Sequence, residues 1–147
     1  MCGIFAYKGD KYNWGKLKES VDLISYRGPD NSHYDNISND VLFAFHRLAI
    51  MGVTISGDQP MKHPHDESLT LICNGEIYNY KELAERYDFN LTTGSDCEII
   101  LYLYQKFGIE RTIKDLDGVF MFVLHDASSD QLFASRDPIG VRPGFIG

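Results

Sequence analysis

Residues 41–50 read VLFAFHRLAI, a nearly continuous apolar run. A strand with one face in water alternates apolar and polar residues, whereas a strand covered on both faces does not. The run therefore predicts a buried strand with a packed layer on each side. Residues 69–79, LTLICNGEIYN, predict a second buried strand, which is expected to end at Asn74 and Gly75 because Asn-Gly favours a turn.

Other segments supply the layers around these two strands. Apolar residues recur with helical spacing, which predicts helices in residues 14–26, 80–87 and 96–108. Further strands are expected in residues 3–9, 118–126 and 130–137, the last two joined as a hairpin. Strands and helices do not alternate strictly, so the order favours a layered α+β domain over a doubly wound parallel fold.

The bulk composition limits the classes of partner. The chain has 147 residues, 44% hydrophobic and 24% charged, which is typical of one globular domain. Its net charge is −7 and it has no Lys/Arg cluster, which argues against a nucleic-acid partner and against an anionic membrane surface. A small polar substrate fits this composition better.

Cysteine and histidine usage points to a reducing compartment without a metal. Cys2, Cys73 and Cys97 are three in number and lack CxxC spacing, so neither a disulfide framework nor a zinc site is expected. His63 and His65 flank a proline, which favours a solvated loop over a metal site. The start lacks the pattern of a signal peptide, and no apolar run is long enough to span a membrane, so a cytoplasmic protein is expected.

Cys2 directly follows the initiator methionine, and two interpretations are open. Cysteine behaves as a small hydrophobe, so Cys2 can be the first buried residue of the strand that begins at Gly3. Alternatively, removal of Met1 leaves a thiol nucleophile and a free α-amine on one residue. Position alone does not choose between them.

Three charged residues lie close to glycines near the predicted strand ends: Arg47, Glu76 and Asp96. Each has an ordinary structural explanation, since Arg47 can pair with a surface carboxylate and the two acids can support helix starts. Taken together, one guanidinium and two carboxylates match the α-carboxylate and the α-ammonium of a free amino acid. The set therefore predicts an amino-acid site.

Asn74 and Gly75 also have two explanations. Asn-Gly is the commonest hairpin turn. Here it lies between a predicted strand and a predicted helix, where the Asn74 amide and the unhindered Gly75 N–H can form an oxyanion hole. Two such donors would stabilise the oxyanion of an acyl-transfer reaction.

Seven segments occur in an order that resembles a known family. Together they cover essentially the whole chain, and the chain resembles the class II glutamine amidotransferases, most closely the glutaminase domain of glutamine-hydrolysing asparagine synthetases. The segments are residues 1–5 (MCGIF), 27–30 (RGPD), 46–50 (HRLAI), 74–80 (NGEIYNY), 93–101 (TGSDCEIIL), 116–126 (LDGVFMFVLHD) and 136–143 (RDPIGVRP).

The resemblance implies a fold and a domain. The fold is the four-layer αββα sandwich of N-terminal-nucleophile hydrolases, an α+β fold expected here to be incomplete at its C-terminus. Residues 1–147 would then form a truncated glutaminase domain (glutamine amidotransferase type 2), and no synthetase domain is present in the sequence.

The resemblance also implies a mechanism, hydrolysis of glutamine to glutamate and ammonia. Met1 is removed, Cys2 attacks the substrate amide with its own α-amine as proton carrier, and Asn74 and Gly75 hold the oxyanion. The implied glutamine-binding set is Arg47 for the carboxylate, Glu76 and Asp96 for the ammonium, and the backbone of Leu48 and Ile50 as the pocket lining.

Two departures from the family pattern keep an alternative open. Ala49 and Gly52 replace polar side chains near the substrate carboxylate, and the ATP-binding motif of the synthetase domain is absent. The chain itself is expected to need no cofactor. ATP and magnesium would be used by a separate synthetase domain or chain that acts in trans. The alternative is a non-catalytic remnant that binds glutamine or a synthetase partner.

Overall fold

The computed structural model describes residues 2–10, 12–48 and 58–147. Antiparallel strands and short helices make up the described chain, with one 3₁₀ turn, η1. The elements are β1 (Gly3–Lys8), α1 (Trp14–Asp22), η1 (Ser25–Arg27), β2 (Asn31–Asn36), β3 (Val41–Arg47), β4 (Met61–His63), β5 (Asp66–Ile77), α2 (Tyr80–Tyr87), α3 (Glu98–Phe107), α4 (Ile109–Asp115), β6 (Gly118–Asp126) and β7 (Gln131–Arg136).

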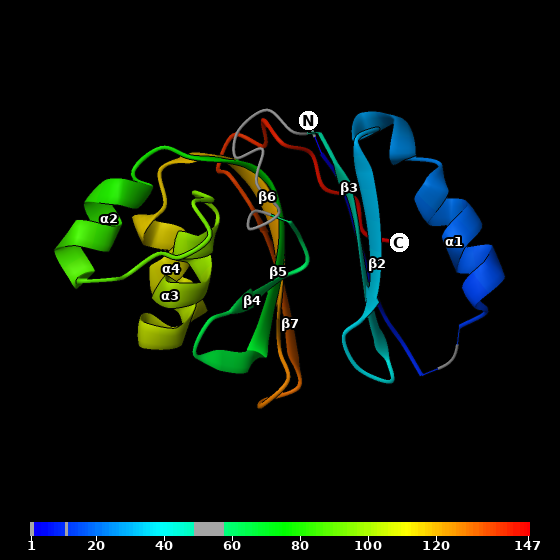
Figure 1. Cartoon of the computed structure of the whole chain (residues 1–147), viewed down its shortest axis with the longest axis horizontal. Helices are drawn as coiled ribbons and strands as arrows, with labels where there is room; N and C mark the ends of the chain where they lie inside the picture. The colour runs from blue at the N-terminus through cyan, green and yellow to red at the C-terminus, as the bar shows by residue number, and fades with distance from the viewer. Residues whose placement is uncertain (1, 11, 49–57) are drawn as a thin grey trace.

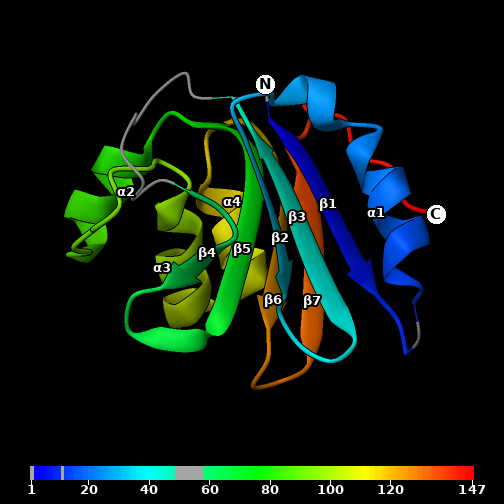
Figure 2. The same ribbon diagram turned by 45° about the vertical axis from the view of Figure 1, so that its right-hand side comes forward.

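The strands form two antiparallel sheets that face each other. One has the order β1-β3-β2 and the other the order β4-β5-β6-β7. Helix α1 covers the outer face of the first sheet, and α2, α3 and α4 cover the outer face of the second (Figures 1 and 2). The predicted α+β class is therefore confirmed.

Strand β3 is buried on both faces, as its apolar run predicts. Val41 and Phe43 pack into the space between the sheets, where they meet Ile72 of β5. Leu42 and Ala44 point the other way and pack against α1. Alternate side chains therefore supply two different cores, which explains why the sequence shows no alternation of apolar and polar residues.

The second sheet is also covered on both faces. Its outer face packs with the buried residues of α3 in the largest apolar cluster of the described chain. The cluster residues on the sheet include Leu71, Phe120 and Phe122, and those on α3 include Ile100 and Leu103. This core fixes β5 between the helical layer and the first sheet.

The predicted end of the second buried strand is wrong. Strand β5 runs through Asn74 and Gly75 to Ile77, and these two residues pair with Met121 and Phe120 of β6. A Cβ on Gly75 would lie 2.3 Å from the Val119 carbonyl oxygen. The glycine thus allows close approach of the neighbouring strand and makes no turn.

Three short elements were not predicted: β2, β4 and α4. Strand β2 reads NSHYDN and is an edge strand with largely exposed ends, so it carries no apolar signal. Strands of this kind are held by the ladder with their neighbour, which a local pattern does not reveal. The helix predicted for residues 14–26 ends at Asp22, and a 3₁₀ turn follows at Ser25–Arg27.

The prediction of a solvated loop at His63 and His65 is only half right. His65 is exposed, but His63 belongs to β4 and is 2% exposed. Its ring packs on Tyr102 of α3, with the ring centroids 4.5 Å apart. Burial lowers the pKa of His63. Within the described residues, no helix is long and apolar enough to cross a membrane.

Candidate active site

A cavity of about 290 Å³ opens where the start of β1, the end of β3 and the end of β5 meet the loop before α3. The predicted site residue Ile50, and the departures Ala49 and Gly52, lie outside the described residues. The other predicted site residues line this one cavity: Cys2, Arg47, Leu48, Asn74, Gly75, Glu76 and Asp96.

Cys2 is held between the two sheets. It precedes β1, whose pairing of Gly3 with His46 brings the chain start beside the end of β3. The Cys2 backbone N–H donates to Oδ1 of Asn74 at 3.1 Å, and the Leu48 N–H points to the Cys2 sulfur at 3.5 Å. The half-buried thiol therefore faces the cavity from a fixed backbone and has an N–H donor directed at its sulfur.

Asn74 is 6% exposed and lies near the end of β5. Its side-chain oxygen accepts the Cys2 N–H, so the same amide keeps its NH₂ group for a second partner. Gly75 follows on the cavity wall. Because both residues lie in a paired strand, these donors are carried by a rigid element.

Arg47 ends β3 and is nearly buried, with a side chain 12% exposed. Its Nη1 forms an ion pair with Oδ1 of Asp58. The structural explanation, in which Arg47 pairs with a carboxylate of the chain, is therefore observed, and the carboxylate is one that the sequence did not single out. A guanidinium with one edge fixed in this way has a defined plane.

Two carboxylates, those of Glu76 and Asp96, also line the site. The Asp96 Oδ2 accepts the Ile77 N–H at 2.5 Å, which joins the loop before α3 to the end of β5. Burial raises the pKa of Asp96, and the nearby Glu76 carboxylate raises it further. Glu76 itself lies in β5, so the explanation that it begins a helix is wrong.

The cavity is lined by charged groups of both signs. Arg47 and Arg142 supply cationic groups, whereas Glu76 and Asp96 supply two anionic groups. A free amino acid carries both an α-carboxylate and an α-ammonium, so a lining with both charges suits such a ligand. The cavity volume is at the small end of the range for ligand sites.

Three polar residues at the site were not predicted from the sequence. Arg27 donates from Nε to the carbonyl oxygen of Cys2 at 3.3 Å, and the segment RGPD was the available signal for it. Asp58 binds Arg47, and Gln59 binds the backbone of Cys73 in β5. The last two come from a turn-rich segment, where nothing in the local pattern singles them out.

Comparison with known protein families matches residues 1–147 to the glutamine amidotransferase domain. The chain belongs to this family. Among glutamine amidotransferases, it is similar to asparagine synthetases (glutamine-hydrolysing). The protein of Mesocricetus auratus is 44% identical over 147 residues, and those of Homo sapiens and Gallus gallus are 43% and 42% identical. The resemblance inferred from the seven segments is confirmed.

The match covers nearly the whole chain but a small part of each relative. It includes 99% of this chain and 26% of the relative's length in each of the three cases. The chain therefore spans about a quarter of the asparagine synthetases that it matches.

Proposed function

We propose that this glutamine amidotransferase domain hydrolyses glutamine to glutamate and ammonia with Cys2 as its nucleophile. The observation that carries the proposal is the convergence of Cys2, Asn74 and the Arg47/Asp96 charge pair on one cavity. A nucleophile, an oxyanion donor and an amino-acid anchor are the three parts that amide hydrolysis of a free amino acid requires.

Binding comes first in the proposed sequence. Arg47 takes the α-carboxylate of glutamine, and Asp96 with Glu76 takes the α-ammonium. The backbone of Leu48 and Ile50 lines the pocket beside them. The side-chain amide of the substrate then extends toward Cys2, which lines the same cavity.

The attack requires removal of Met1. The freed α-amine of Cys2 accepts the thiol proton, and the sulfur adds to the carboxamide carbon of glutamine. The oxyanion that forms is held by the Asn74 amide NH₂ and the Gly75 N–H. The contact between the Cys2 nitrogen and Asn74 Oδ1 supports this arrangement, because it engages the amide oxygen and leaves the NH₂ group for the substrate oxygen.

Collapse of the tetrahedral adduct breaks the C–N bond, and the α-ammonium returns its proton to the leaving nitrogen, so ammonia departs. A thioester between Cys2 and the γ-carbonyl of glutamate remains. Water, deprotonated by the α-amine, adds to the thioester, and the C–S bond breaks to give glutamate and the free thiol. The N–H of Leu48 near the sulfur favours its departure as a thiolate.

We also infer that the layers belong to the αββα sandwich of N-terminal-nucleophile hydrolases. Support comes from the order α1, first sheet, second sheet and α2–α4, and from the position of Cys2 immediately before β1 (Figure 1). In this arrangement the chain start lies at an end of the sandwich, where both sheets contribute to the cavity.

The fate of the ammonia is a separate part of the proposal. Relatives named asparagine synthetase (glutamine-hydrolysing) suggest that a synthetase domain or chain consumes it. ATP and magnesium would be bound there, and hydrolysis of glutamine by this domain would need neither. The domain supplied with glutamine, aspartate and MgATP should therefore form glutamate but neither asparagine nor AMP.

Glutamate release from glutamine is the experiment that tests the proposal. The purified chain, with Met1 removal verified by intact mass, should release glutamate and ammonia in equal amounts, and Cys2→Ala should release neither. Cys73→Ala is the matched control, since it removes another thiol of the same cavity wall. A wild-type chain that binds glutamine without turnover would support the non-catalytic alternative.

A further inference from the structure

We propose that the consecutive residues Asp58 and Gln59 are positioning residues, which hold the substrate anchor and the oxyanion donor in place together. Asp58 fixes the guanidinium of Arg47, and Gln59 fixes the strand that carries Asn74. The proposal rests on the hydrolysis of glutamine proposed above, and extends it to two residues that touch neither the thiol nor the oxyanion.

The contact of Asp58 is an ion pair at the end of β3. Asp58 Oδ1 accepts from Arg47 Nη1, and the two side chains are 20% and 12% exposed. On its other side, Asp58 Oδ2 lies 3.6 Å from Nε2 of His33 in β2. Asp58 thus lies beside two strands of one sheet, and its carboxylate helps to orient the Arg47 guanidinium.

The side-chain amide of Gln59 hydrogen-bonds to β5 as the backbone of a neighbouring strand would. Its amide nitrogen donates to the Cys73 carbonyl oxygen at 3.2 Å, and its amide oxygen accepts the Cys73 N–H at 2.5 Å. Strand β4 pairs Met61 with Leu71, and the same antiparallel register continued would place residue 59 opposite residue 73. The side-chain amide of Gln59 therefore continues the hydrogen-bond ladder with β5 beyond the end of β4.

The location of this bridge gives it a role in the site. Gln59 is 6% exposed, so the bonds to Cys73 form away from water, where an unpaired N–H or carbonyl is costly. Asn74 is the next residue of β5, and its side chain contacts Cys2. A loosened backbone at Cys73 would shift the Asn74 amide relative to the thiol.

Asp58 and Gln59 are adjacent, so a single peptide unit joins the residue that contacts Arg47 to the residue that contacts Cys73. The Arg47 guanidinium comes from the first sheet and the Asn74 amide from the second. The pair therefore sets the spacing between the site that binds the substrate head and the site that stabilises the reacting amide.

The test compares KM and kcat for glutamine in two variants. Asp58→Ala should raise KM about tenfold or more, with kcat within about twofold, because the acceptor that orients the Arg47 guanidinium is lost. Gln59→Ala should lower kcat by about ten- to a hundredfold with a small change in KM, because the oxyanion donor moves. Gln59→Glu keeps the chain length and one acceptor for the Cys73 N–H, and it should lower kcat in the same way.

Matched controls separate positioning from stability. Asp22→Asn removes a carboxylate that binds Lys18 and Tyr34 on the far side of the first sheet. Asn79→Ala removes a side-chain amide that bridges the backbone of Asp115 and Asp117. Both controls should lower the melting temperature and leave KM and kcat near the wild-type values.

The outcomes distinguish the two proposals. An active wild-type chain whose Asp58 and Gln59 variants change KM and kcat in parallel, or change the melting temperature alone, would overturn the positioning roles and leave the hydrolysis standing. A wild-type chain that releases no glutamate would overturn both proposals. A raised KM for the Asp58 variant together with a lowered kcat for the Gln59 variant would support both proposals.

Discussion

The backbone N–H of Cys2 donates a hydrogen bond to the side-chain oxygen of Asn74 at 3.1 Å, across 72 positions of the sequence. This contact joins the residue before β1 to β5, an inner strand of the second sheet. It orients the Asn74 amide with its oxygen on the Cys2 nitrogen, which leaves the NH₂ group for a substrate oxygen.

Asn74→Ala should reduce turnover far more than binding. The substitution removes an oxyanion donor, so we expect kcat to fall by about 10²–10³ with KM changed little. Steady-state kinetics of glutamate release measure both values. A rise in KM at constant kcat would instead make Asn74 a binding residue.

Gly75→Ala should destabilise the domain as well as the site. The added Cβ would lie 2.3 Å from the Val119 oxygen and 2.5 Å from the Phe120 Cα, so β5 and β6 must separate. We expect the free energy of unfolding to fall by about 1–3 kcal/mol, which urea denaturation measures. Gly15→Ala in α1 is the control, since a Cβ there meets only Asn13 Oδ1 at 3.3 Å; it should be neutral or stabilising. Equal stability of both variants would contradict the close approach at Gly75.

Asp96→Asn should weaken glutamine binding without loss of structure. The asparagine oxygen can still accept the Ile77 N–H, but the negative charge for the substrate ammonium is lost. We expect KM to rise by about tenfold or more, as for the loss of a charge-assisted contact, and the melting temperature to stay near the wild-type value. An unchanged KM with a lower melting temperature would show that Asp96 supports the start of α3 only.

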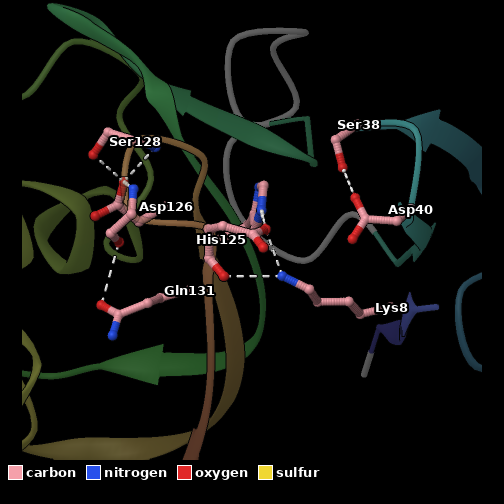
Figure 3. A network of polar contacts seen from close by, with 9 residues as sticks. Lys8, Ser38, Asp40, His125, Asp126, Ser128 and Gln131 are labelled. Carbon is pink, nitrogen blue, oxygen red and sulfur yellow. Dashed lines mark hydrogen bonds and ion pairs between the residues drawn. The ribbon is translucent and has the colours of Figure 1, made fainter. Parts of the chain in front are cut away.

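A buried histidine lies at another part of the sandwich, where the β6–β7 hairpin approaches β1 and the β2–β3 turn (Figure 3). His125 is 1% exposed, and within the described residues neither ring nitrogen has a hydrogen-bond partner. Lys8 binds Asp130 beside it, and Asp40 and Asp126 are the other charged groups nearby. Burial lowers the pKa of His125, and the Lys8 charge lowers it further.

Stability should therefore fall as the pH drops below the pKa of an unfolded histidine, about 6.5. In that range the unfolded chain binds more protons than the folded one, so protonation favours unfolding. His125→Gln should make the slope of the unfolding free energy between about pH 7 and 5 shallower, with a residual slope from His63. A slope that is unchanged in His125→Gln would contradict the lowered pKa.

The sequence predicted the fold best where burial leaves a signal in one segment. The apolar runs of β3 and β5 predicted strands covered on both faces, and the hairpin of β6 and β7 was predicted with nearly correct bounds. The polar edge strand β2 was not predicted, because its ladder with β3 depends on residues distant in the chain. Asn74 and Gly75 misled the prediction, since a turn signal was read where a strand needs room for its neighbour.

Residues of the candidate site could be singled out from the sequence only where their charge or their position in the chain was unusual. Cys2, Arg47 and Asp96 stood out by charge or position, and the structure places them on one cavity. Asp58 and Gln59 did not stand out, because their contacts run to Arg47 and to the backbone of Cys73. A residue that acts through another has no local signature, so only the three-dimensional arrangement reveals it.

The central claim is that Cys2 becomes the N-terminal residue and attacks glutamine. The most direct measurement is peptide mass spectrometry of the chain after reaction with a glutamine-like electrophile such as diazo-oxo-norleucine. One adduct is expected, on a Cys2 that has lost Met1, with Cys73 and Cys97 unmodified and glutamate release abolished in proportion. An adduct on Cys73 or Cys97, or full glutaminase activity in a chain that retains Met1, would contradict it.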